Sequence, residues 1–144
     1  MQLDETDHAL IAALSENARL PVADLARRYG LARTTVQARL DRLEQRGVIA
    51  GYTLRRGAAL KPALRATVLI SVAPNETPTV LSRLKSMPQV EAVHTTSGRF
   101  DLLVTLTAES TEALDATLDR IGEARGVRSS ESLIHLSTRL DRRS

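Results

Sequence analysis

The chain has 144 residues, a formal net charge of +3 and no cysteine. The length allows one ordinary domain or two small ones, and the lack of cysteine excludes disulfides, thiol catalysis and cysteine metal sites. No apolar run is long enough to span a bilayer, and the N-terminus does not look like a signal peptide. We therefore expect a cytoplasmic protein without a membrane partner. Aromatic residues make up only 2% of the chain, so its cores must be aliphatic.

The positive charge is concentrated between Arg27 and Arg56. This window holds eight arginines, no lysine and two acidic residues, a net charge of +6, whereas the rest of the chain sums to −3. The planar guanidinium of arginine suits phosphates and guanine edges. A run of charge is usually a solvated helix face. These arginines lie on a helix-turn-helix pattern, however, which favours binding to nucleic acid.

Helical periodicity predicts three short helices at the start of the chain. They extend from Asp4 to about Asn17, from Pro21 to Tyr29 and from Arg33 to Arg46. Asp4 is placed as the first N-cap, with Asp7 at the capping-box position. Gly30 stands where a left-handed residue ends a helix. Ala32 is a poor cap for the third helix.

The third predicted helix has one apolar side and one polar side. Val36, Leu40 and Leu43 recur at i, i+4 and i+7 and share one face. The other face is small, basic and able to form hydrogen bonds, so we predict that it enters a groove of double-stranded DNA. Base contacts are expected from Thr34, Thr35, Ala38 and Arg39, with Gln37 and Arg42 beside them. Phosphate contacts are expected from Arg27, Arg28, Arg33, Arg42 and Arg46.

A strand over Ile49–Leu54 is expected after the third helix. It would complete a winged-helix-like helix-turn-helix domain over residues 1–54. Residues 55–62 break the periodicity with glycine, proline and three cations, so they are predicted to be a linker. Residues 63–144 then form a second domain.

The second half predicts the element order β-α-β-β-α-β. Strands are expected over Leu64–Ala73, Val90–Thr96, Phe100–Thr107 and Val127–Leu140, and helices over Thr77–Met87 and Thr111–Ala124. This order predicts a ferredoxin-like sandwich, in which two helices cover one face of a four-stranded sheet. The other face is bare, and neither half is large enough for much of a core. We therefore expect a homodimer of an α+β protein.

The histidines and hydroxyl groups form no recognisable catalytic or metal-binding arrangement. His8, His94 and His135 lie far apart, without a carboxylate cluster at ligand spacing. No nucleophile motif and no glycine-rich phosphate loop appears. We therefore expect no catalytic residue, no metal, no cofactor and no enzyme activity.

Two sets of residues, in this order and at this separation, carry a family resemblance. The first is Leu3-Asp4, Asp7, Ile11, Leu14, Asn17-Ala18-Arg19, Leu25-Ala26, Gly30-Leu31, Val36, Arg39-Leu40, Leu43-Glu44, Gly47, Ile49 and Gly51-Tyr52. The second is Ser97-Gly98-Arg99-Phe100-Asp101-Leu102-Leu103 with Gly126-Val127. Over nearly its whole length the sequence resembles the feast/famine (Lrp/AsnC) family of bacterial and archaeal transcription regulators. It departs from the family pattern at Pro21 and Ala32, where serine is usual, and at Arg55-Arg56, where Asp-Pro is usual.

The resemblance implies a ligand-responsive regulator of transcription. Family members dimerise through the second domain and the linker strand, and the dimers often assemble into tetramers or octamers. An amino acid or related small molecule binds near the glycine-aspartate turn and changes assembly or DNA affinity. The resemblance places the effector at Ser97, Gly98, Arg99, Phe100 and Asp101, with Ser130 and Ser132 on the last strand. From the residues alone, this turn is equally a plain hairpin.

Two alternatives to a regulator remain at the level of sequence. Siroheme decarboxylases resemble this family but are enzymes that act on a tetrapyrrole. A ligand-sensing module that binds no DNA is the other alternative. The basic third helix favours the regulator, because neither alternative needs it.

Overall fold

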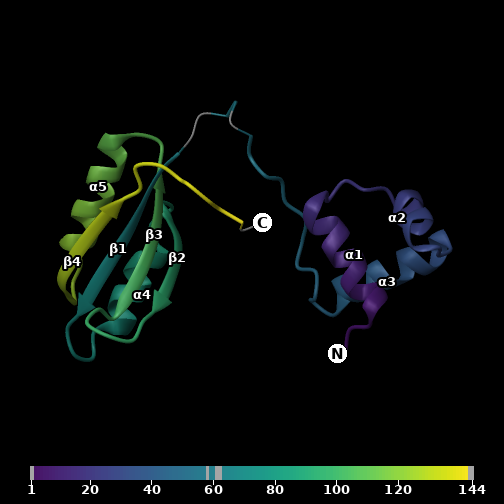
Figure 1. Cartoon of the computed structure of the whole chain (residues 1–144). Helices are drawn as coiled ribbons and strands as arrows, with labels where there is room; N and C mark the ends of the chain where they lie inside the picture. Colours follow the sequence, from purple (N-terminus) through teal and green to yellow (C-terminus); the bar gives the residue numbers. More distant parts are fainter. Residues whose placement is uncertain (1, 58, 61–62, 143–144) are drawn as a thin grey trace. The chain divides into compact units, whose positions relative to one another are not determined.

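The computed structural model describes residues 2–57, 59–60 and 63–142 (Figure 1). The chain forms two compact units that divide after Gly57. The first contains three helices, and the second contains a four-stranded sheet with two helices. Each unit has its own core of aliphatic side chains. Among the described residues, no helix combines the length and the apolarity needed to cross a membrane.

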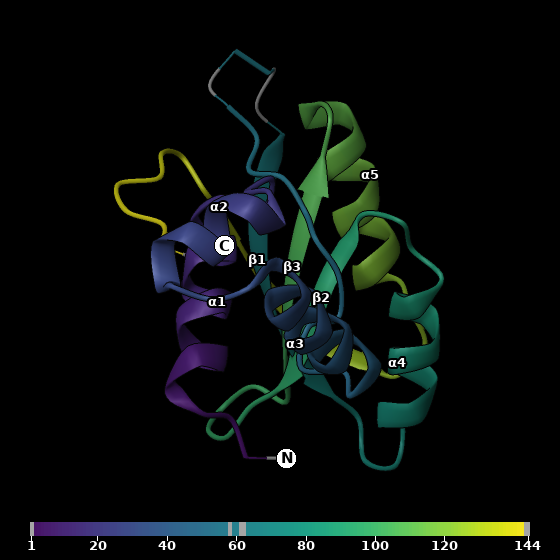
Figure 2. The same cartoon turned by 90° about the vertical axis from the view of Figure 1, so that its right-hand side faces the viewer.

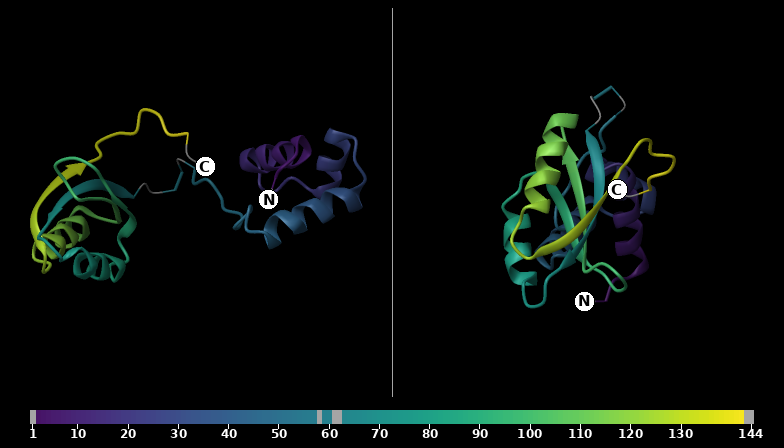
Figure 3. Two further views of the ribbon diagram at one scale, coloured as in Figure 1. Left: turned by 90° about the horizontal axis from the view of Figure 1, so that it is seen from below. Right: turned by 90° about the vertical axis from the view of Figure 1, so that its left-hand side faces the viewer.

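The first unit is the three-helix bundle that the periodicity predicts (Figure 3). Its helices are α1 (Glu5–Glu16), α2 (Val22–Tyr29) and α3 (Arg33–Gln45). Leu10, Leu25 and Leu43 are buried where the helices meet. Each such leucine contributes about 1.5–3 kcal/mol through removal of its apolar surface from water.

The ends of these helices follow from local chemistry. The Asp4 carboxylate accepts a hydrogen bond from the Asp7 amide at 2.8 Å, and Asp7 accepts one from the Asp4 amide at 3.2 Å. This reciprocal capping box confirms the predicted start of α1. Gly30 ends α2 in the left-handed conformation, as predicted. Pro21 is the N-cap of α2 rather than its first helical residue, and Ala32 begins α3 without a side-chain cap.

The strand predicted over Ile49–Leu54 is wrong. In the described part of the first unit, the segment after α3 contains neither strand nor helix. A strand needs a neighbour whose amides and carbonyls complete its hydrogen bonds, and the elements of this unit are helices. The segment therefore lies along the unit in an irregular conformation, with the side chains of Tyr52 and Leu54 exposed by 50% and 76%.

The second unit is the predicted ferredoxin-like sandwich. Its elements in chain order are β1 (Leu64–Val72), α4 (Thr77–Lys85), β2 (Val90–Thr95), β3 (Leu102–Ala108), α5 (Thr111–Gly122) and β4 (Val127–Ile134). The strand order across the sheet is β2-β3-β1-β4, and all neighbours are antiparallel. The two helices lie on the same side of the sheet (Figures 1 and 2).

Burial alternates along the central strands, as the two faces of the sheet require. On β1, the side chains of Ala66, Val68 and Ile70 are buried in the core that α4 and α5 complete. The intervening side chains face the uncovered side and are only partly buried. Leu69 on β1 and Leu103 on β3 are neighbours on this uncovered face. The uncovered face of the sheet is therefore partly apolar.

The last strand is shorter than predicted. β4 ends at Ile134, whereas the sequence pattern extends it to Leu140. Ile134 pairs with Ala66, and the next residue, His135, donates its amide to the Arg65 carbonyl at 2.9 Å. Because β1 begins at Leu64, which this register places opposite Leu136, residues after Leu136 have no partner on that strand.

Candidate DNA-binding and effector sites

Helix α3 presents the faces that its sequence predicts. Val36, Leu40 and Leu43 are buried against α1 and α2. On the other side, the exposed residues include the predicted base and phosphate contacts, namely Arg33, Thr34, Thr35, Gln37, Ala38, Arg42 and Arg46. Arg27 and Arg28 are exposed at the end of α2. The bundle therefore holds α3 with a polar face toward solvent, as DNA binding requires.

An open hollow lies on this polar face. It has a volume of about 410 Å³ and is lined by Thr34, Thr35, Ala38, Arg39 and Arg42. Four of these residues are the predicted base contacts, and the fifth is Arg42, which is predicted to lie beside them. The small side chain of Ala38 leaves room there, while the threonines and arginines supply hydrogen-bonding groups.

Arg39 differs from its neighbours because its side chain is held by α1. One guanidinium nitrogen, Nη1, donates to Asp4 Oδ2 at 2.7 Å and to Asp7 Oδ1 at 3.1 Å. The Asp7 carboxylate also accepts a hydrogen bond from Nη2 of Arg42 at 3.4 Å. The role of these two aspartates as partners of α3 was missed by sequence analysis. They lie more than thirty residues before Arg39 and Arg42, and no local pattern connects the two segments.

Asp4 is strongly acidic in this arrangement. The Arg39 guanidinium and the Asp7 amide stabilise the charged carboxylate and lower its pKa from 3.8 to about 2. The same ion pair raises the pKa of Arg39. A carboxyl group whose pKa is lower in the folded state stabilises the fold above its unfolded pKa, and this contribution disappears as the pH falls through the folded pKa.

Asp4→Asn is therefore expected to flatten the acid dependence of the first unit. In the unaltered protein, the melting temperature of this unit should fall between about pH 4 and about pH 2, partly because Asp4 takes up a proton. Asparagine is as good an N-cap as aspartate, so the variant removes the charge and keeps the cap. Circular dichroism melting across this pH range measures the difference. An equal fall in both proteins would contradict a role for Asp4.

The predicted effector turn joins β2 to β3. Ser97, Gly98 and Arg99 are exposed at its tip, and the Arg99 guanidinium lies 5.1 Å from the centre of the Phe100 ring. Asp101 closes the turn, because its carbonyl accepts the Thr96 amide at 3.0 Å.

Asp101 also connects the turn to the centre of the sheet. Its amide donates to the Ile70 carbonyl at 2.9 Å, and its Oδ2 accepts the Val72 amide at 2.7 Å. Within the described residues, Oδ1 has no protein hydrogen-bond partner. The carboxylate thus secures the end of β1 with one oxygen and leaves the other to solvent or a ligand.

The two serines predicted for the effector site lie on the far side of β1 from this turn. Ser130 pairs with Ile70 and Ser132 pairs with Val68, both on β4, and both serines are exposed. The turn meets β1 from the opposite side, through Asp101. Within one copy of the unit, β1 therefore separates the serines from the turn, although Ser130 and the turn lie at the same end of the sheet.

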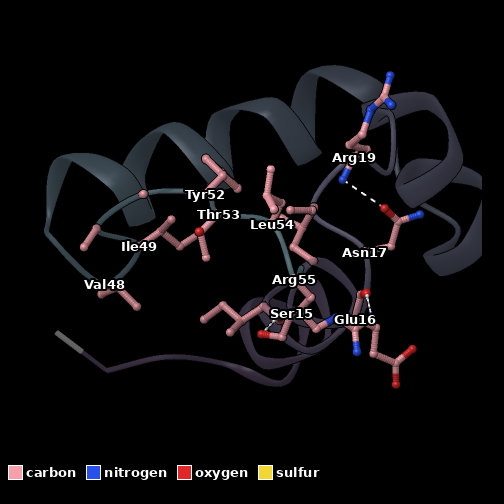
Figure 4. Close-up of a pocket in the computed structure, with 15 residues that line it drawn as sticks. Ser15, Glu16, Asn17, Arg19, Val48, Ile49, Tyr52, Thr53, Leu54 and Arg55 are labelled. Atoms are coloured by element: carbon pink, nitrogen blue, oxygen red, sulfur yellow. Dashed lines mark hydrogen bonds between the residues drawn. The ribbon is translucent and has the colours of Figure 1, made fainter. Parts of the chain in front are cut away.

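A larger hollow in the first unit is lined by residues that belong to neither predicted site (Figure 4). It has a volume of about 500 Å³ between the end of α1 and the segment from Val48 to Arg55. Arg55 Nη2 donates to the Glu16 carbonyl at 2.9 Å, which satisfies a carbonyl at the end of α1. The Tyr52 hydroxyl donates to Glu44 Oε1 at 2.7 Å. Partial burial and this contact raise the pKa of Tyr52 to about 12.

Both units match known domains. Residues 3–44 match the AsnC-type helix-turn-helix domain, and residues 65–144 match the Lrp/AsnC ligand binding domain. The HTH-type transcriptional regulator FL11 of Pyrococcus furiosus is 30% identical, over 93% of this chain and 89% of its own length.

Two solved structures share the fold of the whole chain. The feast or famine regulatory protein of Mycobacterium tuberculosis, complexed with L-methionine, is 32% identical, with a TM-score of 0.86 over 99% of this chain and 98% of that one. AsnC of Escherichia coli has a TM-score of 0.90 and 24% identity, over 100% of this chain and 99% of its own. With an AsnC-type helix-turn-helix unit followed by a matching ligand-binding unit, the chain belongs to the Lrp/AsnC family of transcription regulators.

Proposed function

We propose that this regulator binds double-stranded DNA through α3 and responds to an amino acid bound at the turn of residues 97–101. The observation that carries the proposal is the exposed polar face of α3, with its hollow of about 410 Å³. Thr34, Thr35, Ala38 and Arg42 would contact base edges there. Arg27, Arg28, Arg33 and Arg46 would contact phosphates.

The effector site would offer hydrogen-bond donors and a charged acceptor on a single turn. The exposed backbone of Gly98 offers amides to a ligand carboxylate, and Asp101 Oδ1 offers an acceptor to a ligand ammonium. A zwitterionic amino acid carries both groups. The L-methionine complex of the Mycobacterium tuberculosis regulator supports this ligand class.

Two copies would pair through the uncovered sheet face. Leu69 and Leu103 give this face an apolar centre, and burying them against a second copy would remove them from water. Pairing would also allow Ser130 and Ser132 of one copy to approach the turn of the other. We propose a homodimer that assembles to a tetramer or octamer and acts on chromosomal DNA in the cytoplasm. The regulator itself would need no cofactor.

A screen of the twenty amino acids tests the effector. Thermal shift of the full chain is expected to identify at least one that raises the melting temperature of the second unit, because a ligand that binds only the folded state stabilises it. Gel shift on the DNA upstream of its own gene, with and without that amino acid, then measures linkage between the two ligands. By reciprocity, DNA should change the affinity for the effector by the same factor.

Asp101→Asn is the matched variant. Asparagine keeps an oxygen that can accept the Val72 amide, so the end of β1 stays in place, but the charge for the ligand ammonium is lost. We expect about tenfold or greater loss of effector affinity, since hydrogen bonds to charged groups are worth about 1.5–3 kcal/mol. DNA affinity without effector should not change. Full retention of the thermal shift by this variant would refute the proposed site.

A further inference from the structure

Asp7 is the buried polar centre of the first unit. Its side chain is only 1% exposed and accepts hydrogen bonds from three directions. They come from the Asp4 amide, from Arg39 Nη1 at 3.1 Å and from Arg42 Nη2 at 3.4 Å. A buried carboxylate is costly unless it is paired in this way. The fold itself therefore requires Arg39 and Arg42 at these positions, because they neutralise the buried carboxylate.

The two arginines differ in how firmly they are held. The Arg39 side chain is 26% exposed and its Nη1 contacts both Asp4 and Asp7. The Arg42 side chain is 47% exposed and, among the described acidic residues, pairs with Asp7 alone, at a longer distance. They lie three residues apart on α3, so their side chains are neighbours on the helix surface. Both also line the hollow on the polar face.

Fixing these side chains before DNA arrives has an energetic consequence. A free arginine loses much of its rotamer freedom when it forms a defined contact, at a cost of about 0.5–1.5 kcal/mol for an interface side chain. A guanidinium already oriented by a buried carboxylate has lost that freedom during folding. Its planar donors then meet one arrangement of acceptors better than others.

We propose that Asp7 is a positioning residue for base discrimination: its buried carboxylate sets the orientation of Arg42 toward DNA, with Arg39 as the bridge to α1. In this arrangement the Arg39 guanidinium binds Asp4 and Asp7, and the Arg42 guanidinium contacts the DNA. The inference rests on the proposed binding of DNA by α3. Asp7 acts without touching DNA, so its effect is on the preference for one sequence and not on general attraction to the duplex.

The test compares a preferred duplex with a shuffled one. A labelled duplex of about one to two helical turns is selected by the purified protein from a random pool, and fluorescence anisotropy gives its affinity and that of a shuffled duplex. For Asp7→Asn we expect the ratio of the two affinities to fall about fivefold or more. Asparagine retains an acceptor for the Asp4 amide. Affinity for the shuffled duplex should change less than about twofold, because no phosphate contact is lost.

Glu5→Gln is the matched control for charge. Glu5 is exposed in the same first turn of α1, so this variant makes the same change in net charge without touching either arginine. It should keep the discrimination ratio of the unaltered protein. All affinities are measured well below each variant's melting temperature, which circular dichroism gives for the same samples.

Substitutions of Arg39 provide a second test if Asp7→Asn does not fold. Arg39→Lys keeps a cation for the aspartates and should retain most of the discrimination, whereas Arg39→Met should lose it about fivefold or more. An equal loss in both would overturn the positioning role, since it would mean that the Arg39 fork itself reads a base. Unchanged discrimination in folded Asp7→Asn would also overturn it. If the unaltered protein does not distinguish the two duplexes, the proposed DNA-binding function fails instead.

Discussion

Raising the salt concentration from about 50 mM to about 200 mM is expected to weaken binding to duplex DNA by about 10³- to 10⁵-fold. Each phosphate that a cation neutralises releases condensed counterions, so the logarithm of affinity falls with that of salt by about 0.9 per contact. Four arginines per copy are proposed for such contacts: Arg27, Arg28, Arg33 and Arg46. Two copies that use most of them make about 6–8 phosphate contacts, a number that lies within the range giving a loss of this size.

The structure leaves these arginines available for phosphates. Arg28, Arg33 and Arg46 are exposed and, among the described residues, form no ion pair. Arg27 pairs with Asp24 one turn earlier on the same helix, and an exposed pair of this kind contributes well under about 1 kcal/mol. It can therefore be exchanged for a phosphate at little cost.

Anisotropy titrations at four or five salt concentrations give the slope of the logarithm of DNA affinity against the logarithm of salt concentration. Arg33→Ala should reduce it by about 0.9 for each copy that contacts DNA. Arg83→Ala, which removes the same charge from the exposed surface of α4 in the second unit, should leave it unchanged. A slope near zero for the unaltered protein, or an equal change in both variants, would contradict the assignment of α3 as the DNA-binding element.

Gly126→Ala is expected to destabilise the second unit by about 2–5 kcal/mol. Gly126 has a φ of +94°, and a Cβ atom there would lie 2.7 Å from Glu76 Cβ and 2.9 Å from Val80 Cγ2. The left-handed conformation costs a residue with a side chain about 1–2 kcal/mol, and forcing atoms into a packed region adds about 1–3 kcal/mol. The carbonyl of Gly126 accepts the Ala73 amide at 2.8 Å, so the backbone there is not free to move away.

Gly98→Ala separates the two causes. Gly98 has a similar φ of +99°, but no atom lies within 4 Å of the position its Cβ would take. This variant should lose only the conformational part, about 1–2 kcal/mol. Calorimetry of the full chain should show the melting transition of the second unit lowered by about 10 °C or more in Gly126→Ala, and by clearly less in Gly98→Ala. Equal shifts would mean that crowding against α4 contributes nothing.

The elements that sequence analysis predicted well have local signals. The helices of the first unit follow from apolar residues at helical spacing and from the end signals at Asp4 and Gly30. The strand predicted over Ile49–Leu54 has a suitable composition, but a strand also requires a neighbour, and local sequence does not say whether one is present. The overlong prediction for β4 has the same origin, because the end of β4 depends on where β1 begins.

For the candidate DNA-binding site, the sequence predicts which face of α3 is exposed, but it does not predict the contacts that the side chains on that face make. Helical spacing correctly places Thr34, Thr35 and Ala38 on the exposed side of α3. It cannot show that Arg39 is paired with Asp4 and Asp7, since that contact joins segments 32 to 35 positions apart. For the same reason it could not show that one oxygen of Asp101 is already engaged by the sheet.

The bond between Asp101 and Val72 makes the proposed effector site mechanically continuous with the sheet. Val72 ends β1, and the register of β1 against β4 shifts between Ser71 and Val72. In the proposed site, a ligand ammonium on Asp101 would draw electron density from the carboxylate and weaken the hydrogen bond that it accepts from the Val72 amide. The end of β1 would then relax, and β1 lies between β3 and β4 in the sheet's uncovered surface. Ligand binding at the proposed site and the shape of that surface would consequently be linked.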